Sequence, residues 1–175
     1  MPDIRLEWSA GEIRADLTLD QATGLYDTGH DLVTALVVSL FSDRLADPDD
    51  VIPDGGRDRR GWWGDADAVA IWGAGADMIG SRLWLLSREK RVPATLVRAE
   101  IYVREAIAWM TAPAVQAVAG FDVSCQWFDL ATGREAIDIA ELPGSEGALA
   151  CRIVAHRYDG SRVSARFDPL WRDFA

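Results

Sequence analysis

The chain has 175 residues, of which 49% are hydrophobic, and it carries a formal net charge of −10. This size and composition suit a globular protein, and we expect residues 1–175 to form a single domain with its own hydrophobic core. The negative charge argues against general binding to nucleic acid or to an anionic membrane surface, so we expect neither as a partner.

Cysteines, histidines and targeting signals are sparse. Two cysteines are too few for a disulfide framework, and together with two histidines they do not make a usual zinc site. We therefore expect no metal, no cofactor, and free, half-buried thiols at Cys125 and Cys151 on strands. The sequence shows no basic region followed by an apolar run at its start, and no apolar run of membrane-spanning length. These features favour a protein that folds in the cytoplasm.

The first quarter of the chain predicts a β-hairpin followed by a central helix. Apolar and polar residues alternate over residues 3–8 and 12–19, which is the period-two pattern of two half-buried strands. Residues 31–45 are apolar on nearly every side, which is typical of a buried helix with Asp31 or Thr28 as its N-cap. The many β-branched side chains in this segment leave a strand as the alternative.

A dense loop follows at residues 54–65, with the sequence DGGRDRRGWWGD. It contains four glycines, three arginines, three aspartates and two adjacent tryptophans. Glycine permits positive φ angles, arginine and aspartate form planar ion pairs, and each indole carries a large apolar area. We expect a fixed, folded loop that inserts at least one indole either into the core or into a partner protein.

Two helices are predicted between this loop and the last third of the chain. Residues 66–78 have mostly small side chains, which predicts a short helix or an irregular excursion. Residues 79–88 predict a short helix capped by Ser81. Residues 93–111 are the clearest helix, because Pro93 suits a first turn and apolar residues recur with helical spacing. The apolar stripe of this helix consists of Leu96, Ala99, Val103, Ala106, Ile107 and Met110.

Charged residues on these helices predict specific pairs. Glu100 and Arg104 have the spacing of an ion pair on the outer face of one helix. Residues 82–104 are rich in arginine, and we expect these side chains to meet acidic neighbours, either the acidic cluster at residues 43–67 or another subunit. The arginines concerned are Arg82, Arg88, Arg91, Arg98 and Arg104.

The last third predicts antiparallel strands. Apolar side chains alternate over residues 121–127 and 149–155, and Ile137 and Ile139 suggest a short strand between them. Asp159-Gly160 is a strong hairpin turn. Taken with the earlier segments, this order predicts an α+β fold: a small mixed domain with an N-terminal β-hairpin, central helices and a C-terminal antiparallel β-meander or hairpin.

Two motifs at this spacing resemble a known family. PDGGRDRRGWWGD at 53–65, followed by GSRLWLLSR at 80–88, resembles the Mu-like phage and prophage baseplate proteins. The later helix and the terminal hairpin fit the same family, so the resemblance covers most of the chain. Residues 66–78 and 129–147 are longer and richer in alanine than the family pattern.

This family resembles the sheath-initiating baseplate wedge protein of T-even phages, which is sometimes described as lysozyme-like. The resemblance implies a small α+β structural protein of the virion, located in the baseplate of a contractile tail and assembled in the host cytoplasm. It further implies docking on baseplate wedge proteins, templating of the first ring of tail sheath subunits, and six copies around the tail axis.

The two motifs supply the candidate structural and interface residues. These are Asp58, Arg59, Arg60, Gly61, Trp62, Trp63, Gly64 and Asp65 in the loop, and Gly80, Ser81, Arg82, Leu83 and Trp84 in the second motif. The loop arginines, including Arg57, either contact an acidic partner or pair with Asp54, Asp58 and Asp65, and we favour internal pairing for at least one. Because adjacent side chains of an extended segment point opposite ways, one indole is expected in the core and the other outside; the alternative is that both are buried.

An enzyme is the main alternative to a structural role. A lysozyme-like glycosidase that cleaves peptidoglycan needs two carboxyl groups, one of them kept protonated, and Asp58 and Asp65 beside the tryptophans are the candidates. The neighbouring arginines favour ionised carboxylates, which is wrong for a general acid, so we expect no enzymatic activity. His30 and His156 lie near no G-x-S-x-G elbow, and His156 is expected on a strand surface.

The terminal hairpin, residues 148–167, suggests how subunits join. A long hairpin offers an unpaired strand edge, and strand addition is a common way to connect two chains. We therefore expect this hairpin, or the strand at 121–128, to pair with a strand of a sheath subunit.

Overall fold

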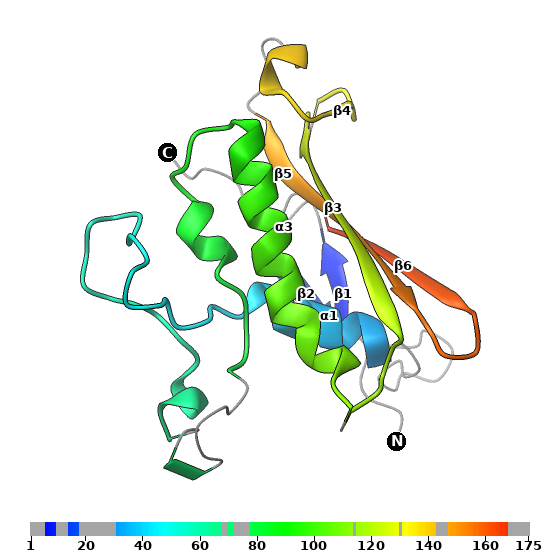
Figure 1. Cartoon of the computed structure of the whole chain (residues 1–175). Helices are drawn as coiled ribbons and strands as arrows, with labels where there is room; N and C mark the ends of the chain where they lie inside the picture. The colour runs from blue at the N-terminus through cyan, green and yellow to red at the C-terminus, as the bar shows by residue number, and fades with distance from the viewer. Residues whose placement is uncertain are drawn as a thin grey trace.

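A computed structural model of the chain describes residues 6–9, 14–17, 31–67, 70–71, 78–113, 115–129, 131–142 and 147–167. Within these ranges the protein has the expected α+β fold, with two main helices and a four-stranded antiparallel sheet (Figure 1). The N-cap candidate Thr28 lies outside the described residues, as do the ends of the predicted N-terminal strands and most of residues 66–78.

The sheet has the strand order β4-β3-β5-β6, and all its pairings are antiparallel. Its strands are β3 (Gly120–Phe128), β4 (Glu135–Ala136), β5 (Ala148–His156) and β6 (Arg162–Phe167). The predicted alternation is confirmed, because Val123, Cys125 and Trp127 of β3 are buried while the side chains between them are exposed or half-buried. The predicted strand through Ile137 and Ile139 is wrong: β4 ends before Ile137, and a 3₁₀ turn, η4 (Ile139–Glu141), follows.

Helix α3 (Pro93–Ile107) lies against the sheet and continues into a 3₁₀ turn, η3 (Ala108–Thr111). The predicted apolar stripe is confirmed, since all six of its residues are buried. The predicted ion pair on its outer face is wrong. Glu100 accepts a hydrogen bond from the backbone N–H of Cys125 at 3.0 Å, and Arg104 donates to the carbonyl oxygens of Phe121 and Val123. Both side chains reach the sheet because α3 runs along the outer edge of β3.

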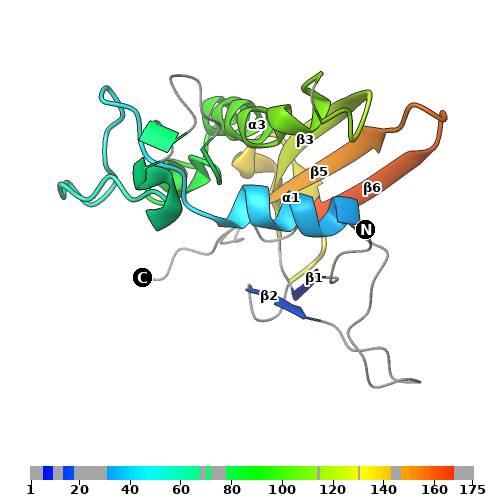
Figure 2. The ribbon, with the colours of Figure 1, turned by 90° about the horizontal axis from the view of Figure 1, so that it is seen from below.

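Helix α1 (Asp31–Phe41) confirms the helical reading of residues 31–45, although it ends four residues early, and the strand alternative is wrong. It contacts both α3 and the N-terminal hairpin, β1 (Leu6–Ser9) with β2 (Arg14–Leu17). Figure 2 shows α1 between α3 and this hairpin. The Phe41 ring packs edge-on against Phe167 of β6, with ring centroids 5.6 Å apart, so α1 and the sheet share one core.

The two cysteines lie in this core. Cys125 on β3 and Cys151 on β5 are free and directly opposite each other in the strand register. They are 5% and 1% exposed, so they are more deeply buried than expected. A hydrogen bond to Cys151 and burial both raise the pKa of the Cys125 thiol well above its usual range. Both thiols are therefore core side chains.

Residues 42–67 leave the helix–sheet body and form a long loop beside it in both views (Figures 1 and 2). The chain then returns through a short 3₁₀ helix, η2 (Leu83–Leu86), whose four residues are buried. Ser81 was expected to cap a longer helix here, and its hydroxyl oxygen accepts a long hydrogen bond, 3.4 Å, from the N–H of Leu83, the first residue of η2. The N-cap position itself is held by Arg82, which makes no side-chain cap hydrogen bond. Ser81 also joins this segment to the end of α1.

Candidate docking surface

The end of α1 and the second motif are joined by a short parallel bridge between Asp43 and Ser81. The Arg44 N–H donates to the Ser81 carbonyl at 3.0 Å, and the Ser81 N–H donates to the Ser42 carbonyl at 2.9 Å. The buried Ser81 hydroxyl donates to the Leu40 carbonyl at 2.7 Å, one of the carbonyls left free at a helix C-terminus. The second motif therefore terminates α1.

Gly80 has the backbone geometry that this bridge requires. Its φ is +103°, and a Cβ at this position would lie 2.4 Å from the Ser42 carbonyl oxygen. Only glycine combines this φ with such a close approach.

Trp84 joins the second motif to the loop. Its indole N–H donates to the Arg44 carbonyl at 2.9 Å, and the Arg60 guanidinium lies 4.5 Å from the centre of its ring. Arg60 also pairs with Asp43, with 2.7 Å between Nη1 and Oδ2. The two motifs, some twenty residues apart in sequence, are thus in direct contact through a cation–π interaction.

Arg82 is the most heavily bonded arginine in this region. Its guanidinium donates to Asp47, Asp50 and Glu105 and lies 4.8 Å from the centre of the Tyr102 ring. Burial lowers the pKa of Arg82, but the hydrogen bonds and negative charges of Glu105 and Asp50 outweigh this effect and raise it above its usual range. The expectation that Arg82 meets the acidic cluster is confirmed, and the contact holds the loop against α3.

The loop arginines do not pair inside the loop as expected. Arg60 pairs with Asp43. Arg59 forms two hydrogen bonds with Ala46: the Arg59 side-chain Nε–H donates to the Ala46 carbonyl, and the Ala46 N–H donates to the Arg59 carbonyl. The candidate acid Asp65 is 8% exposed and accepts a hydrogen bond from the Ile79 N–H, and Asp58 accepts one from the Arg60 N–H. The loop is therefore shaped by contacts to other segments and by its own backbone, and both candidate catalytic carboxyls serve this shape.

Trp62 and Trp63 point outward together. Their ring centroids are 5.1 Å apart with an interplanar angle of 42°, and the residues are 40% and 83% exposed. The expectation that one fills the core is wrong, and so is the alternative that both are buried. Gly64 lies directly under the Trp62 ring, because a Cβ there would be 2.0 Å from a ring carbon. The chain therefore holds two indoles in contact with each other, tilted by 42°, on its surface, and we call this pair the indole ledge.

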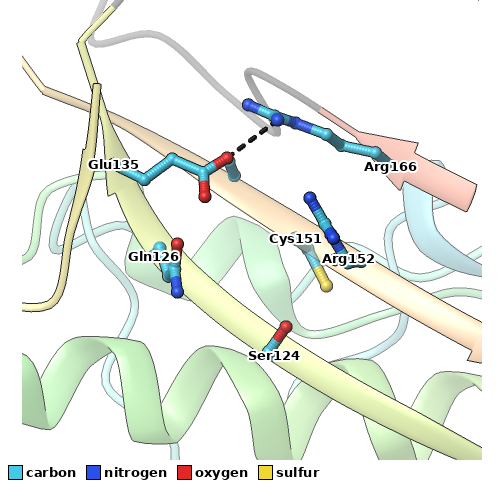
Figure 3. A pocket seen from close by; sticks show the side chains of 7 residues that line it. Ser124, Gln126, Glu135, Cys151, Arg152 and Arg166 are labelled. Carbon is cyan, nitrogen blue, oxygen red and sulfur yellow. Dashed lines mark ion pairs between the residues drawn. The ribbon is translucent and has the colours of Figure 1, made fainter. Parts of the chain in front are cut away.

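A second surface feature is a polar hollow of about 180 Å³ on the sheet face that α3 does not cover (Figure 3). Arg166 of β6 pairs there with Glu135 at 2.8 Å, and its guanidinium lies over the Phe128 ring. Arg152 of β5 lies directly opposite Arg166 in the strand register. Sequence analysis did not single out these residues, although the Asp159-Gly160 turn sets a register that places them opposite each other.

His156 lies on a strand surface as expected, where its Nε2 is 2.7 Å from Asp122. Neither this pair nor the hollow combines a nucleophile with a base in the way that covalent catalysis requires. In the part of the chain that the structure describes, no three histidine, cysteine or acidic side chains gather as a metal site would need. The described helices are also too short or too polar to cross a membrane.

Fold and surface together define a small α+β protein whose distinctive residues build an external loop tied to α1, η2 and α3. Comparison with known proteins identifies the family of the chain. The model of the family described as phage protein GP46 matches residues 32–162. The chain therefore belongs to this family of Mu-like phage baseplate proteins.

Two relatives illustrate the family. The baseplate protein gp46 of Escherichia phage Mu is 45% identical over 119 residues, which covers 67% of this chain and 74% of the relative. The Mu-like prophage FluMu protein gp46 of Haemophilus influenzae is 34% identical over 123 residues, covering 68% and 76%. No solved structure matches the chain.

Proposed function

We propose that the protein is a structural component of a contractile phage tail baseplate, where it docks on wedge proteins and initiates the tail sheath in six copies. The baseplate role is supported by the Mu relative, which is itself named a baseplate protein. Docking on wedge proteins, sheath initiation and the copy number rest on the likeness to the T-even wedge protein. The proposed location follows from these roles: the protein is part of the virion and is assembled in the host cytoplasm. A peptidoglycan-cleaving glycosidase is the alternative, and the structural use of both Asp58 and Asp65 weighs against it.

The sheet edges favour one site for strand addition. On β3, the backbone groups of Phe121, Val123 and Cys125 point away from β5, because they bond to Arg104 and Glu100 of α3. Side chains thus already occupy this edge, and β4 covers its far end. The strand at 121–128 is therefore a poor acceptor for a sheath strand.

The β6 edge is the better acceptor. Hydrogen bonding alternates along an antiparallel pair, so if odd-numbered residues of β3 face outward, its even-numbered residues bond to β5. In the observed register, the even-numbered residues of β5 face β3, so the odd-numbered residues of β5 bond to β6. The hydrogen bond from the Arg157 N–H to the Ser161 carbonyl, just beyond the strand ends, follows the same pattern. The backbone groups of Ser164 consequently face away from β5, toward an incoming strand.

The substitution Ser164→Pro tests this proposal. It removes one outward N–H without removing a ladder bond to β5, and proline is tolerated on sheet edges. We expect the variant to fold but to nucleate few sheaths when mixed with baseplates and sheath subunits of the same phage, as counted by electron microscopy. Ser164→Ala keeps the N–H and is the matched control. Normal sheath assembly with Ser164→Pro, or with a chain lacking residues 158–171, would contradict the proposal.

A further inference from the structure

The indole ledge is held in place by several independent contacts. Gly64 allows the Trp62 ring to lie flat on the backbone, and Asp65 anchors the following turn, η1 (Trp63–Asp67), to Ile79. On the other side, Arg60 adopts a φ of +53°, which is uncommon for a residue with a side chain. Such strain persists only where the surroundings enforce it, so the orientation of the two indoles is built in rather than accidental.

Further apolar side chains border the ledge. Leu45 contacts Gly61, because a Cβ added to Gly61 would lie 3.1 Å from the Leu45 Cβ. The backbone N–H of Ile79 donates a hydrogen bond to the Asp65 carboxylate. Both are partly exposed, at 39% and 37%. Clustered exposed apolar side chains, with tryptophan at their centre, are typical of protein-binding surfaces.

The segment that carries the ledge has more exposed carboxylates than unpaired exposed arginines. Arg60 is exposed but paired with Asp43, and Arg59 is half-buried against Ala46, so Arg57 is the exposed loop arginine that pairs with no carboxylate of the described residues. The exposed carboxylates of the same segment are Asp54, Asp58 and Asp67. A partner therefore meets an apolar centre with an acidic rim, and the open faces of the indoles also attract cations.

Building on the proposed function, we infer that the indole ledge docks into an apolar groove, rimmed by lysine or arginine, on another protein of the same baseplate. The charge argues for this occupant over the other candidates. A second copy of the chain would bring a net charge of −10 to the same acidic rim, and an anionic membrane would also be repelled. The basic rim supplies the orientation, and the groove that receives the indoles supplies most of the affinity.

The test measures binding of the full chain to each of the other baseplate proteins of the same phage, purified separately. The double variant Trp62→Ser/Trp63→Ser is compared with Tyr158→Ser, which alters an exposed aromatic residue beyond the end of β5. We expect one baseplate protein to bind the wild-type chain, the double variant to bind it roughly thirtyfold more weakly or worse, and Tyr158→Ser to bind normally. Asp58→Lys should weaken the same complex severalfold, and added salt should reduce the difference.

Equal binding of the double variant and the wild type, or no binding of the wild type to any baseplate protein, overturns the inference. It is also overturned if the variant abolishes self-association in sedimentation, or binding to vesicles of anionic lipid, because the occupant is then a second copy or a membrane. Ser164→Pro separates this inference from the proposed function. This variant should still bind the baseplate protein through the indole ledge but should not nucleate sheaths. The binding result therefore tests the inference, and the nucleation result tests the proposed function.

Discussion

At the scale of single residues, the junction between the two motifs depends on backbone geometry that no other residue type reproduces. Gly80 is the clearest case, because its positive φ coincides with a close approach to the Ser42 carbonyl. The bridge between Asp43 and Ser81 then ends α1 and sets the start of the external loop. One residue without a side chain thus determines where the loop begins.

We expect Gly80→Ala to lower the free energy of unfolding by about 2–5 kcal/mol, from the strain of positive φ and the steric overlap together. Gly133→Ala is the matched control, since its φ is +70° but nothing lies within 4 Å of its Cβ position. That variant should lose only about 1–2 kcal/mol. Urea denaturation of both variants measures the difference, and equal losses would show that the approach to Ser42 is unimportant.

A pH dependence is expected from Glu89, whose carboxylate accepts a hydrogen bond from Nη1 of Arg98 and forms an ion pair with Nη2 at 2.9 Å. The hydrogen bond to Arg98 lowers the pKa of Glu89 below its ordinary value of 4.5. A lowered pKa contributes stability that is present above the unfolded-state pKa and is lost as the pH falls through the folded-state pKa. Because both side chains are well exposed, solvent screening limits the contribution to a few tenths of a kcal/mol.

The comparison with Glu89→Gln checks this expectation. The difference in the free energy of unfolding between wild type and variant should be constant near neutral pH and should shrink as the pH falls below about 4.5. A difference that grows in acid would have the wrong sign for a lowered pKa.

At the scale of secondary structure, α3 does more than cover the sheet. Glu100 and Arg104 satisfy backbone groups on the outer edge of β3, which would otherwise be free to pair with another chain. Among the described residues the two sheet edges therefore differ, because side chains of α3 bond to the β3 edge whereas the backbone of Ser164 on β6 faces away from β5. In the proposed function, this asymmetry would direct a sheath strand to the β6 edge.

The double variant Glu100→Ala/Arg104→Ala should expose the β3 edge. We expect a loss of about 1–3 kcal/mol for each charged hydrogen-bonding group and an increase in concentration-dependent association. Ile101→Ala, an exposed position on the same helix, is the control and should change neither property. Light scattering measures the association and urea denaturation measures the stability. Light scattering equal to that of the wild type would show that the edge is not available for pairing.

At the scale of the whole molecule, one hydrophobic cluster joins α1, α3 and the sheet. Cys125 and Cys151 lie inside it, and the raised pKa keeps the Cys125 thiol protonated and unreactive. Cys151 also contributes to the lining of the polar hollow, but both residues are at most 5% exposed, so we expect a reagent to reach the thiols readily only when the core opens. Thiol labelling therefore reports on the cooperativity of the whole chain.

If residues 1–175 form a single domain, labelling by iodoacetamide should be slow in the native protein. It should accelerate at the urea concentration where the far-ultraviolet circular dichroism signal is lost. Cys125→Ala and Cys151→Ala, taken singly, identify which thiol reacts. Labelling of either thiol well before the loss of secondary structure would mean that the sheet opens independently of the helices.

Local pattern was sufficient for much of the fold. Period-two alternation identified β3 and β5, helical spacing identified the buried stripe of α3, and the Asp159-Gly160 turn defined the β5–β6 hairpin. These features depend on residues close in sequence, and the steric preferences of such residues do not depend on the tertiary structure around them. Pattern failed at Ile137, where two apolar residues at strand spacing lie beyond the short strand β4.

The sequence predicted which residues make up the site but not how they are arranged. The sequence alone determined that the loop at 54–65 and the motif at 80–88 belong to one family and carry its distinctive residues. Only the tertiary structure decided that Arg60 pairs with Asp43, that Arg82 joins the acidic segment to α3, and that both indoles face outward. The physical reason is that ion pairs and burial depend on which segments, distant in sequence, come into contact in the fold. The spacing of residues within one segment does not determine these contacts.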